Sequence, residues 1–419
     1  MSTQPTPYKN PFRPGAGHMP LYLAGREEEN KEFQKLLEQD TILENLVLTG
    51  LRGLGKTVLL ETLKPLAIQA GWLWAGTDLS ETMSLSEANM ATRLLTDLSV
   101  ITSSIVVAQE QAPVHFSTTP TQKQIVFDYP TLVAIYQSTP GLVADKLKHV
   151  LETIWKFLPQ LNKRGIVFAY DEAQNLADHS SKDQYPLSLL LDVFQSLQRK
   201  DIRFMLVLTG LPTLFPKLVE ARTFAERMFH VLFLEPLNER ETEDAIKRPI
   251  AKTECPLHIA DDSIKIVWRL TNGYPYFVQF VCRELYDTWL LRYDGKVNPP
   301  PYPIDAIVRK LDTDFFAGRW AKSTDRQRQL LGIVARLPNS DAEFAVLDVV
   351  GHSANKALEK PFSSSSINQM FVILADAGLI YKNRHGKYSF AVPMLGDFIR
   401  RNLGIPTNAS WVEPKNTLF

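Results

Sequence analysis

The stretch GLRGLGKT, Gly50–Thr57, constrains the fold of this chain more than any other part of the sequence. It follows the apolar run Asn45–Thr49, which has the character of a buried strand, and precedes Val58–Leu63, where helical spacing begins. Its glycines let the backbone bend so that successive N–H groups point toward one place at the N-terminus of the next helix. This order predicts a parallel α/β sheet with an anion-binding loop at its carboxyl edge.

The spacing Gly50-x-x-x-x-Gly55-Lys56-Thr57 is the phosphate-binding P-loop pattern. We expect Lys56 to reach the β- and γ-phosphates of ATP and to act in catalysis, and the Thr57 hydroxyl to ligate Mg²⁺. The alternative is a glycine-rich turn followed by Lys-Thr by chance, which the flanking strand and helix disfavour. The nucleotide-binding residues expected at the loop are Gly50, Leu51, Arg52, Gly53, Leu54, Gly55, Lys56, Thr57 and Val58.

Two acidic residues, Asp171 and Glu172, directly follow the apolar strand Ile166–Tyr170. Both carboxylates should therefore lie at the carboxyl edge of the sheet, where ligands of open α/β sheets bind. We expect Asp171 to complete the Mg²⁺ shell and Glu172 to act as general base on the attacking water. An Asp-Glu pair after a strand is as often a solvated turn, but here it converges with the P-loop on one site.

Three further residues are catalytic candidates. Thr209 directly follows the apolar strand residues Ile202–Leu208, so its hydroxyl is expected at the carboxyl edge of the sheet, near the γ-phosphate or the attacking water. The alternative is that Thr209 is only a turn residue at the end of a strand. Arg222 and Arg227 could each reach the nucleotide of a neighbouring subunit and stabilise charge in the transition state. Pairing with Glu226 or capping of a helix is the alternative for these arginines.

The pattern along the chain predicts a P-loop ATPase core, then a helical lid and a C-terminal winged-helix domain. The lid helices are expected at Asn238–Ile246, Asp262–Leu270 and Tyr274–Leu291, with a further helix at Asp305–Phe316. The winged helix is expected to hold helices at Asp325–Leu337, Glu343–Val350 and Ile367–Ala377 and a hairpin of Leu379–Lys382 with Lys387–Phe390. The predicted boundaries are a flexible arm at 1–19, the core at 20–235 with an insertion around 105–125, the lid at 236–317, the winged helix at 318–405 and a tail at 406–419.

Charge limits the classes of partner. Lys plus Arg and Asp plus Glu both total 46, so no net charge draws the whole chain to nucleic acid or membrane. Residues 316–405, however, hold twelve Lys and Arg against seven Asp and Glu, and Lys382, Arg384 and Lys387 cluster at the hairpin tip. This distribution favours nonspecific contact with duplex DNA by the wing.

The candidate recognition helix Ser363–Ala377 has no Lys or Arg, and only Asn368 and Gln369 could read base edges. Sequence-specific DNA binding is therefore the weaker hypothesis, and protein contact by the winged helix is the alternative. The chain has only two cysteines, Cys255 and Cys282, and neither a leader pattern nor a spanning apolar run, which predicts a cytoplasmic protein without a membrane partner.

These motifs resemble the AAA+ and STAND group of P-loop ATPases, especially the origin-recognition-initiator-like and transposition-regulator branches. The resemblance implies an ATP-dependent switch that often forms homo-oligomers and often engages DNA, with Leu23 and Arg26 near the adenine pocket and Pro275 near the base. The initiators usually carry an arginine at the start of a lid helix, whereas Gly273–Phe277 has none, as in slowly hydrolysing STAND switches. The matching pieces are Gly25-Arg26-Glu27, GLRGLGKT, IVFAYDEAQNL (Ile166–Leu176), Thr209 and Thr271–Pro275.

Two functional hypotheses follow. The first is an ATPase switch that assembles on DNA or regulates events there, in replication, transposition or defence against mobile elements and phage. The second is a STAND-like signalling ATPase that controls a separate effector through protein contacts without binding DNA. The chain carries no recognisable nuclease or protease motif, so both hypotheses imply a separately encoded effector protein.

Overall fold

The structure is a computed structural model that describes residues 8–111, 122–253, 259–292, 304–384 and 386–405. Two compact units can be distinguished by their internal contacts. The sheet unit contains residues 26–50 and 56–234, and the helical unit contains the described residues of 1–25, 51–55 and 235–419. No helix in the described part of the chain is both long and apolar enough to cross a membrane.

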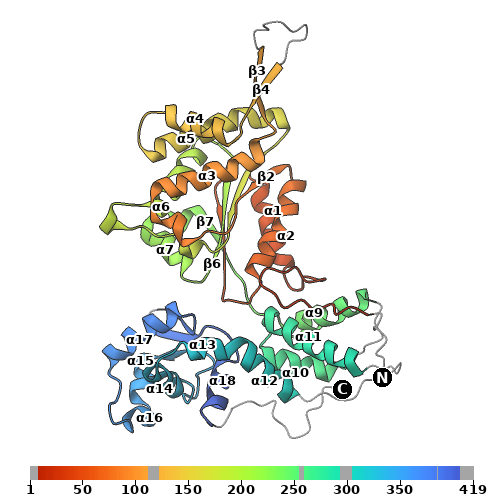
Figure 1. Cartoon of the computed structure of the whole chain (residues 1–419), viewed down its shortest axis with the longest axis vertical. Helices are drawn as coiled ribbons and strands as arrows, with labels where there is room; N and C mark the ends of the chain where they lie inside the picture. The colour runs from red at the N-terminus through yellow and green to blue at the C-terminus, as the bar shows by residue number, and fades with distance from the viewer. Residues whose placement is uncertain (1–7, 112–121, 254–258, 293–303, 385, 406–419) are drawn as a thin grey trace. The chain divides into compact units, whose positions relative to one another are not determined.

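A five-stranded parallel sheet organises the sheet unit (Figure 1). Its strands β1, β5 and β6 are buried along their whole length, because helices cover both faces. Helices α1 (Glu27–Leu37) and α2 (Lys56–Gln69) lie on one side, and α3 (Glu87–Thr102) and α6 (Pro186–Gln198) lie on the other (Figure 1). The predicted α/β P-loop fold is thereby confirmed. The strands, in spatial order, are β2 (Trp72–Ala75), β5 (Gly165–Tyr170), β6 (Phe204–Gly210), β1 (Asn45–Thr49) and β7 (Phe229–Phe233).

A buried amide pair fixes the register of the central strands. The side chain of Asn45 donates to Gln198 Oε1 at 3.2 Å and to the carbonyl of Met228 at 3.1 Å, and its Oδ1 accepts from the backbone N–H of Leu206 at 2.7 Å. Gln198 in turn donates to Asn45 Oδ1 at 2.8 Å and to the carbonyl of Phe204 at 2.7 Å. Because these buried polar groups are paired, their hydrogen bonds offset the cost of desolvation and hold the start of β1 against β6 and the end of α6.

The predicted insertion lies between α3 and α4. Strands β3 (Val106–Gln111) and β4 (Gln122–Val126) pair antiparallel there, and residues 112–121 of the predicted insertion lie outside the described residues. The remaining elements of the sheet unit are η1 (Glu81–Leu85), α4 (Tyr129–Ser138), α5 (Val143–Phe157), η2 (Leu158–Leu161), η3 (Ala173–Asn175), η4 (Ser180–Lys182), α7 (Leu214–Ala221) and α8 (Ala225–Met228).

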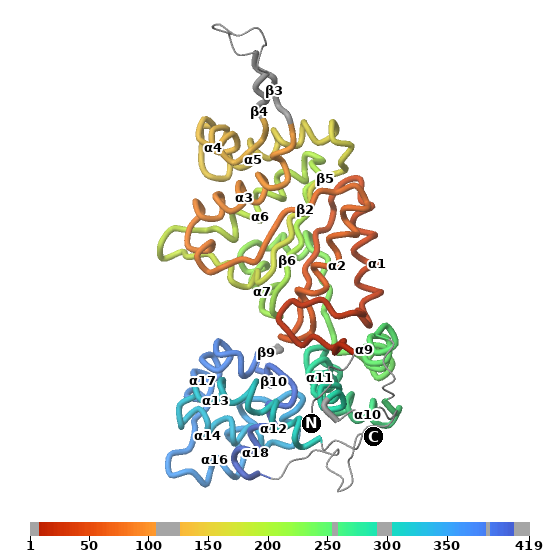
Figure 2. Tube along the Cα trace, turned by 45° about the vertical axis from the view of Figure 1, so that its right-hand side comes forward, coloured from red at the N-terminus to blue at the C-terminus, as the bar shows by residue number. Residues whose placement is uncertain are grey.

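The helical unit begins with three helices that pack on one another, α9 (Glu239–Lys252), α10 (Asp261–Thr271) and α11 (Pro275–Arg292) (Figure 2). Residues 8–25 form no helix or strand; Asn10 and Arg13 contact α11, whereas Leu21 and Tyr22 contact α9. Asn10 donates to the carbonyl of Arg283 at 3.0 Å and to Asp287 at 2.7 Å, and the buried ring of Phe12 meets Tyr286 edge to face. The described residues of the predicted arm are thus draped over the predicted lid.

The C-terminal part of the helical unit combines helices with a three-stranded antiparallel sheet in the order β8, β10, β9. The predicted helix Glu343–Val350 is wrong at its start, because Phe344–Ala345 pairs with β10 as strand β8 and the helix begins at Val346. The predicted single helix Asp305–Phe316 is interrupted by a π-helical turn, η5. The elements are α12 (Ile304–Leu311), η5 (Asp312–Phe316), α13 (Ala317–Ala321), α14 (Asp325–Val334), β8 (Phe344–Ala345), α15 (Val346–Gly351), α16 (Ser353–Lys356), α17 (Ser364–Asp376), β9 (Ile380–Arg384), β10 (Lys387–Phe390) and α18 (Leu395–Asn402).

Candidate functional site

The glycine-rich loop joins β1 to α2, and α2 begins at Lys56. Gly53 and Gly55 have φ values of +87° and +85°, in the left-handed region that residues with a side chain rarely adopt. Lys56 Nζ donates to the carbonyl of Gly50 at 2.9 Å, so the side chain folds back over the loop. The sequence therefore bends where the P-loop pattern requires glycine, and the N-terminus of α2 stands directly behind the bend.

The central contact of the site joins the start of α2 to the end of β5. The Thr57 hydroxyl donates to Asp171 Oδ2 at 2.5 Å, and the backbone N–H of Glu172 donates to Asp171 Oδ1 at 2.8 Å. Burial raises the pKa of Asp171 above its usual 3.8, and the negative charges of Glu172 and Asp78 act in the same direction, whereas the two hydrogen bonds oppose the rise. The half-buried hydroxyl of Thr57 and the buried carboxylate of Asp171 together form the hard-oxygen donor set that Mg²⁺ prefers.

Glu172 has an unusual backbone conformation and a defined partner. Its φ of +53° lies in the left-handed region, where a residue other than glycine or asparagine is strained, and such strain concentrates at functional sites. Gln174 donates a hydrogen bond to Glu172 Oε2, while Gln174 Oε1 accepts from the backbone N–H of Leu211 at 3.1 Å. Lys217 donates to the carbonyl of Gln174 at 2.8 Å. Gln174 therefore links the ends of β5 and β6 and orients Glu172.

Two threonine hydroxyls are buried without a partner at the carboxyl edge of the sheet. Thr209 is the last residue but one of β6, where Leu48 of β1 is its neighbour, and Thr49 ends β1 beside Gly210. Neither hydroxyl oxygen has a hydrogen-bond partner among the residues that the structure describes. Because a buried polar group without a partner is rare, these two oxygens are suited to meet water or a ligand.

The two candidate arginines have different surroundings. Arg222 forms two hydrogen bonds with the carboxylate of Asp192, at 2.8 and 2.7 Å, and a third with Ser188 Oγ at 2.7 Å. These contacts to α6 engage its guanidinium, and the hydrogen bonds that Arg222 donates to Asp192 raise the pKa of Arg222. Arg227, in contrast, is exposed and has no side-chain hydrogen bond or ion pair within the described part of the chain.

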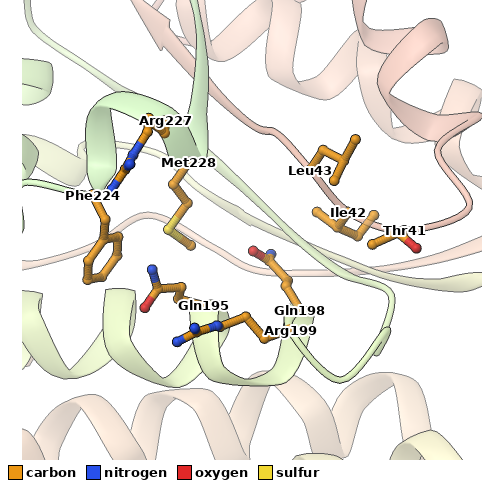
Figure 3. Close-up of a pocket in the computed structure, with 9 residues that line it drawn as sticks. All are labelled: Thr41, Ile42, Leu43, Gln195, Gln198, Arg199, Phe224, Arg227 and Met228. Atoms are coloured by element: carbon orange, nitrogen blue, oxygen red, sulfur yellow. The ribbon is translucent and has the colours of Figure 1, made fainter.

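Arg227 lies at the rim of a cavity of about 380 Å³ in the sheet unit (Figure 3). The segment before β1, the end of α6 and the α8 region enclose it, so the cavity lies at the amino edge of the parallel sheet. Thr57 and Asp171 lie at the carboxyl edge, and Arg227 therefore does not belong to the phosphate site of its own chain. The lining residues are Thr41, Ile42, Leu43, Gln195, Gln198, Arg199, Phe224, Arg227 and Met228.

The remaining predicted residues are divided between the units. Arg26 is buried in the sheet unit and contacts Glu29 Oε1 at 3.5 Å, whereas Leu23 and Pro275 are half-buried in the helical unit. On the hairpin, Lys382 is exposed and Lys387 is half-buried, and the side chain of Arg384 lies outside the described residues.

Sequence reasoning from single residues missed Gln174 and Thr49. The signal for Gln174 was present in the DEAQNL stretch, which places an amide two residues after Glu172. For Thr49 the signal was its position as the last residue before the glycine-rich loop.

Comparison with known proteins identifies part of the chain. Residues 22–208 match the AAA ATPase domain, and residues 313–399 match a domain of unknown function. No curated protein has significant sequence similarity to the chain.

Among solved structures, a Walker-type ATPase of Pyrococcus abyssi is 15% identical, with 90% of this chain and 96% of that chain covered and a TM-score of 0.56. The ORC2 protein of Aeropyrum pernix, in ADPNP–ADP complexes, is 12% identical, with 93% and 98% covered and a TM-score of 0.52. At such identities these likenesses concern the fold. Residues 22–208, which hold the glycine-rich loop and the Asp171–Glu172 pair, therefore match an AAA ATPase domain, and the fold of the chain is similar to the folds of these two solved structures.

Proposed function

We propose that this chain binds ATP with Mg²⁺, hydrolyses it slowly and works as a nucleotide-dependent switch. The observation that carries the proposal is the hydrogen bond between Thr57 and Asp171, which joins the two motifs at one point. A hydroxyl and a buried carboxylate have little reason to meet there in a merely structural turn. The orphan hydroxyls of Thr49 and Thr209 at the same edge support a polar ligand in place of an apolar one.

Each residue has a distinct role in this proposal. Lys56 and the backbone N–H groups of Gly50–Val58 bind the phosphates, while Thr57 and Asp171 ligate the metal. Mg²⁺, when bound, neutralises charge on the phosphate oxygens. Glu172 accepts the proton of the attacking water, and Gln174 holds its carboxylate in place. Leu23, Arg26 and Pro275 are proposed to bind the adenine end.

Variants of the loop lysine test nucleotide binding. Lys56→Ala should weaken binding of ATP about 30- to 150-fold, because it removes a charge-assisted contact to phosphate of about 2 to 3 kcal/mol. Lys64→Ala, an exposed lysine on the same helix, is the matched control and should bind as the parent does. Unchanged ATP affinity in Lys56→Ala, measured by calorimetry, would refute the proposed site.

A second variant tests the general base. Glu172→Gln keeps the shape of the side chain but cannot accept a proton, so turnover should fall about 100- to 10,000-fold while ATP stays bound. Phosphate release measures turnover, and nucleotide extraction from the purified protein identifies what is retained. Undiminished turnover in Glu172→Gln would remove Glu172 as the base.

We further propose that the switch acts as a homo-oligomer, with a separately encoded effector protein, and that it contacts duplex DNA through the winged helix. The support for DNA is the local excess of Lys and Arg and the exposed Lys382 on β9. Such binding should weaken steeply with salt, because phosphate contacts release counterions. Lys382→Glu should lower DNA affinity, and ATP turnover should rise when duplex DNA is added to the parent. Salt-insensitive binding or none would contradict the DNA role.

One observation favours the second candidate, a signalling ATPase that acts through protein contact. Helix α17, the predicted recognition helix, exposes 61% of Val372 and 54% of Ile373, beside the exposed Asp376. An apolar and acidic face is unsuited to phosphate but typical of a protein interface. A stable copurifying protein, lost on Val372→Ser with Ile373→Ser, together with no response to DNA, would favour this candidate.

A further inference from the structure

The cavity of about 380 Å³ at the amino edge of the parallel sheet lies entirely within the sheet unit (Figure 3). Small-molecule sites in proteins are concave, mostly apolar and roughly 300 to 1,000 Å³ in volume. The cavity falls at the low end of that range, so it has room for a small ligand. The proposed nucleotide site, with Thr57 and Asp171, lies at the opposite edge of the sheet and does not account for it.

Four apolar side chains line the cavity and come from two separate parts of the sheet unit. Ile42 and Leu43 belong to the segment before β1, and Phe224 and Met228 belong to the α8 region. Ile42 and Met228 are buried, whereas Leu43 is 72% exposed. A leucine exposed to that extent at the rim of a cavity is stabilised when an apolar group enters the cavity and covers it.

Three polar side chains of the lining have no partner within the part of the chain that the structure describes. Gln195 and Arg199 are four residues apart at the end of α6 and therefore share a face, and Arg227 belongs to α8. No side-chain hydrogen bond or ion pair joins any of the three to another described residue. In Figure 3 the amide of Gln195 and the guanidinium of Arg199 point toward the side of the cavity on which Arg227 lies.

The other two polar residues of the lining are already paired. The hydroxyl of Thr41 donates to Asp201 Oδ1 at 2.9 Å. The amide of Gln198 donates to Asn45 Oδ1 at 2.8 Å and accepts from the amide of Asn45 at 3.2 Å. The polar groups that remain for a ligand are therefore two guanidinium groups and one amide, which together carry two positive charges.

The three unpaired groups are suited to a carboxylate. A guanidinium group binds a carboxylate through two parallel hydrogen bonds, and an amide donates a further one. A cation is favoured at the C-terminus of a helix, which accounts for Arg199 alone. That effect accounts neither for Gln195 nor for Arg227, which comes from a different element. Together with the apolar lining, the charges indicate a ligand with an anionic end and an apolar body.

We propose that the cavity binds a small organic acid, a carboxylate with an aromatic or branched aliphatic body. The carboxylate lies against Gln195, Arg199 and Arg227, and the body lies against the four apolar side chains. The bound acid connects the segment that enters β1 with α6 and with the segment that enters β7. It also engages Arg227 and thereby competes with any contact of this side chain to a neighbouring subunit. The inference is independent of the proposed nucleotide site.

The test uses 4-phenylbutyrate as the probe and measures its affinity for the full chain by ligand-detected NMR. The neutral 4-phenylbutanamide should bind about 10-fold more weakly, because it lacks the charge-assisted hydrogen bonds. Arg199→Gln and Arg227→Gln should each weaken binding of the acid about 10-fold for the same reason. Leu43→Ser should weaken it about 3-fold through loss of apolar contact. All three substituted side chains are exposed, so the variants should fold.

Three controls separate this inference from general effects and from the proposed function. Arg240→Gln removes the same charge from an exposed arginine on α9, and Leu142→Ser changes a leucine that is 77% exposed and does not line the cavity. Both variants should bind the acid as the parent does. Lys56→Ala should also keep the parental affinity for the acid. If the acid binds but ATP does not, the proposed function fails and this inference stands.

Four results would overturn the proposal. The first is the absence of saturable binding of 4-phenylbutyrate to the parent, and the second is parental affinity in both Arg199→Gln and Arg227→Gln. The third is displacement of the probe by inorganic phosphate at equal concentration, which would show a site for a simple anion. The fourth is displacement by the acetylated and amidated peptide Gly-Asp-Phe-Gly at lower concentration than by the acid itself, which would assign the cavity to a protein segment.

Discussion

Arg222 and Arg227 provide a matched pair that separates a structural arginine from one available to a neighbouring subunit. Both precede β7 and would lose the same charge on substitution by alanine. Arg222 is held by Asp192 and Ser188 of α6, whereas Arg227 is exposed at the rim of the cavity at the amino edge of the sheet (Figure 3). We expect Arg222→Ala to lower stability with little effect on turnover, and Arg227→Ala to do the reverse.

The magnitude for Arg222 follows from its three hydrogen bonds to Asp192 and Ser188, which accompany a fourth to the carbonyl of Ala221. The side chains of Arg222 and Asp192 are 36% and 39% exposed, so solvent screening makes the stabilisation from this ion pair much smaller than that from a buried one. The bidentate geometry and the hydrogen bond to Ser188 make the stabilisation larger than that of an isolated surface ion pair, so we expect Arg222→Ala to cost about 1 to 2 kcal/mol. That loss corresponds to a fall in Tm of roughly 2 to 8 °C for a unit of this size. Arg227→Ala should shift Tm by less than about 2 °C.

The assay measures Tm by scanning fluorimetry and phosphate release as a function of protein concentration. If Arg227 reaches the nucleotide of a neighbour, parental turnover per chain should rise with concentration, and Arg227→Ala should fall about 1,000-fold below it at saturation. Asp192→Ala is the control, and its effect on Tm should be less than additive with that of Arg222→Ala. An unchanged Tm with abolished turnover in Arg222→Ala, beside a fully active Arg227→Ala, would refute the reasoning.

Three further predictions concern buried groups. Only the carboxylate form of Asp171 ligates a metal and burial raises its pKa, so the affinity for Mg·ATP should fall as the pH drops through that raised pKa. In the nucleotide-free chain the Tm should instead fall as the pH rises through it, because the buried carboxyl group then becomes charged. Titrations at a series of pH values measure both the affinity and the Tm. Gly76→Ala should cost about 3 to 5 kcal/mol, because its φ is +135° and a Cβ would lie 1.8 Å from the carbonyl oxygen of Ala169; soluble yield and Tm report this loss. The side chain of Arg400 is 1% exposed and pairs with Asp341 at 2.8 Å, so Arg400→Ala should lower the free energy of unfolding by about 3 to 5 kcal/mol, as measured by urea unfolding.

The parts of the fold that the sequence predicts well are those where a local pattern and the tertiary environment agree. Strands β1, β5 and β6 are continuously apolar because helices cover both faces, so the pattern alone locates them. The interruption of the predicted helix Asp305–Phe316 could not be found in this way. The π turn depends on Asp312 meeting Arg401, which is distant in the sequence. Strand β8 was missed for the same reason, since its two residues become a strand only by pairing with β10.

The candidate site shows the same division more sharply. The P-loop and the Asp-Glu pair are visible because their chemistry fixes both residue type and spacing. Nothing in the spacing, however, indicates that Arg222 would be engaged by Asp192 or that the backbone N–H of Tyr276 would donate to Gly53. These facts depend on which side chains are left without a partner after the chain has folded, and local sequence carries no record of that.

Unsatisfied groups therefore carry functional information that motifs do not. The hydroxyls of Thr49 and Thr209 are among several buried side-chain atoms of the described residues that have no hydrogen-bond partner, and these two lie at the carboxyl edge of the sheet. A fold selected only for stability would replace such groups with apolar side chains at little cost. Their retention at the carboxyl edge of the sheet is explained if an ordered water or a polar ligand completes them.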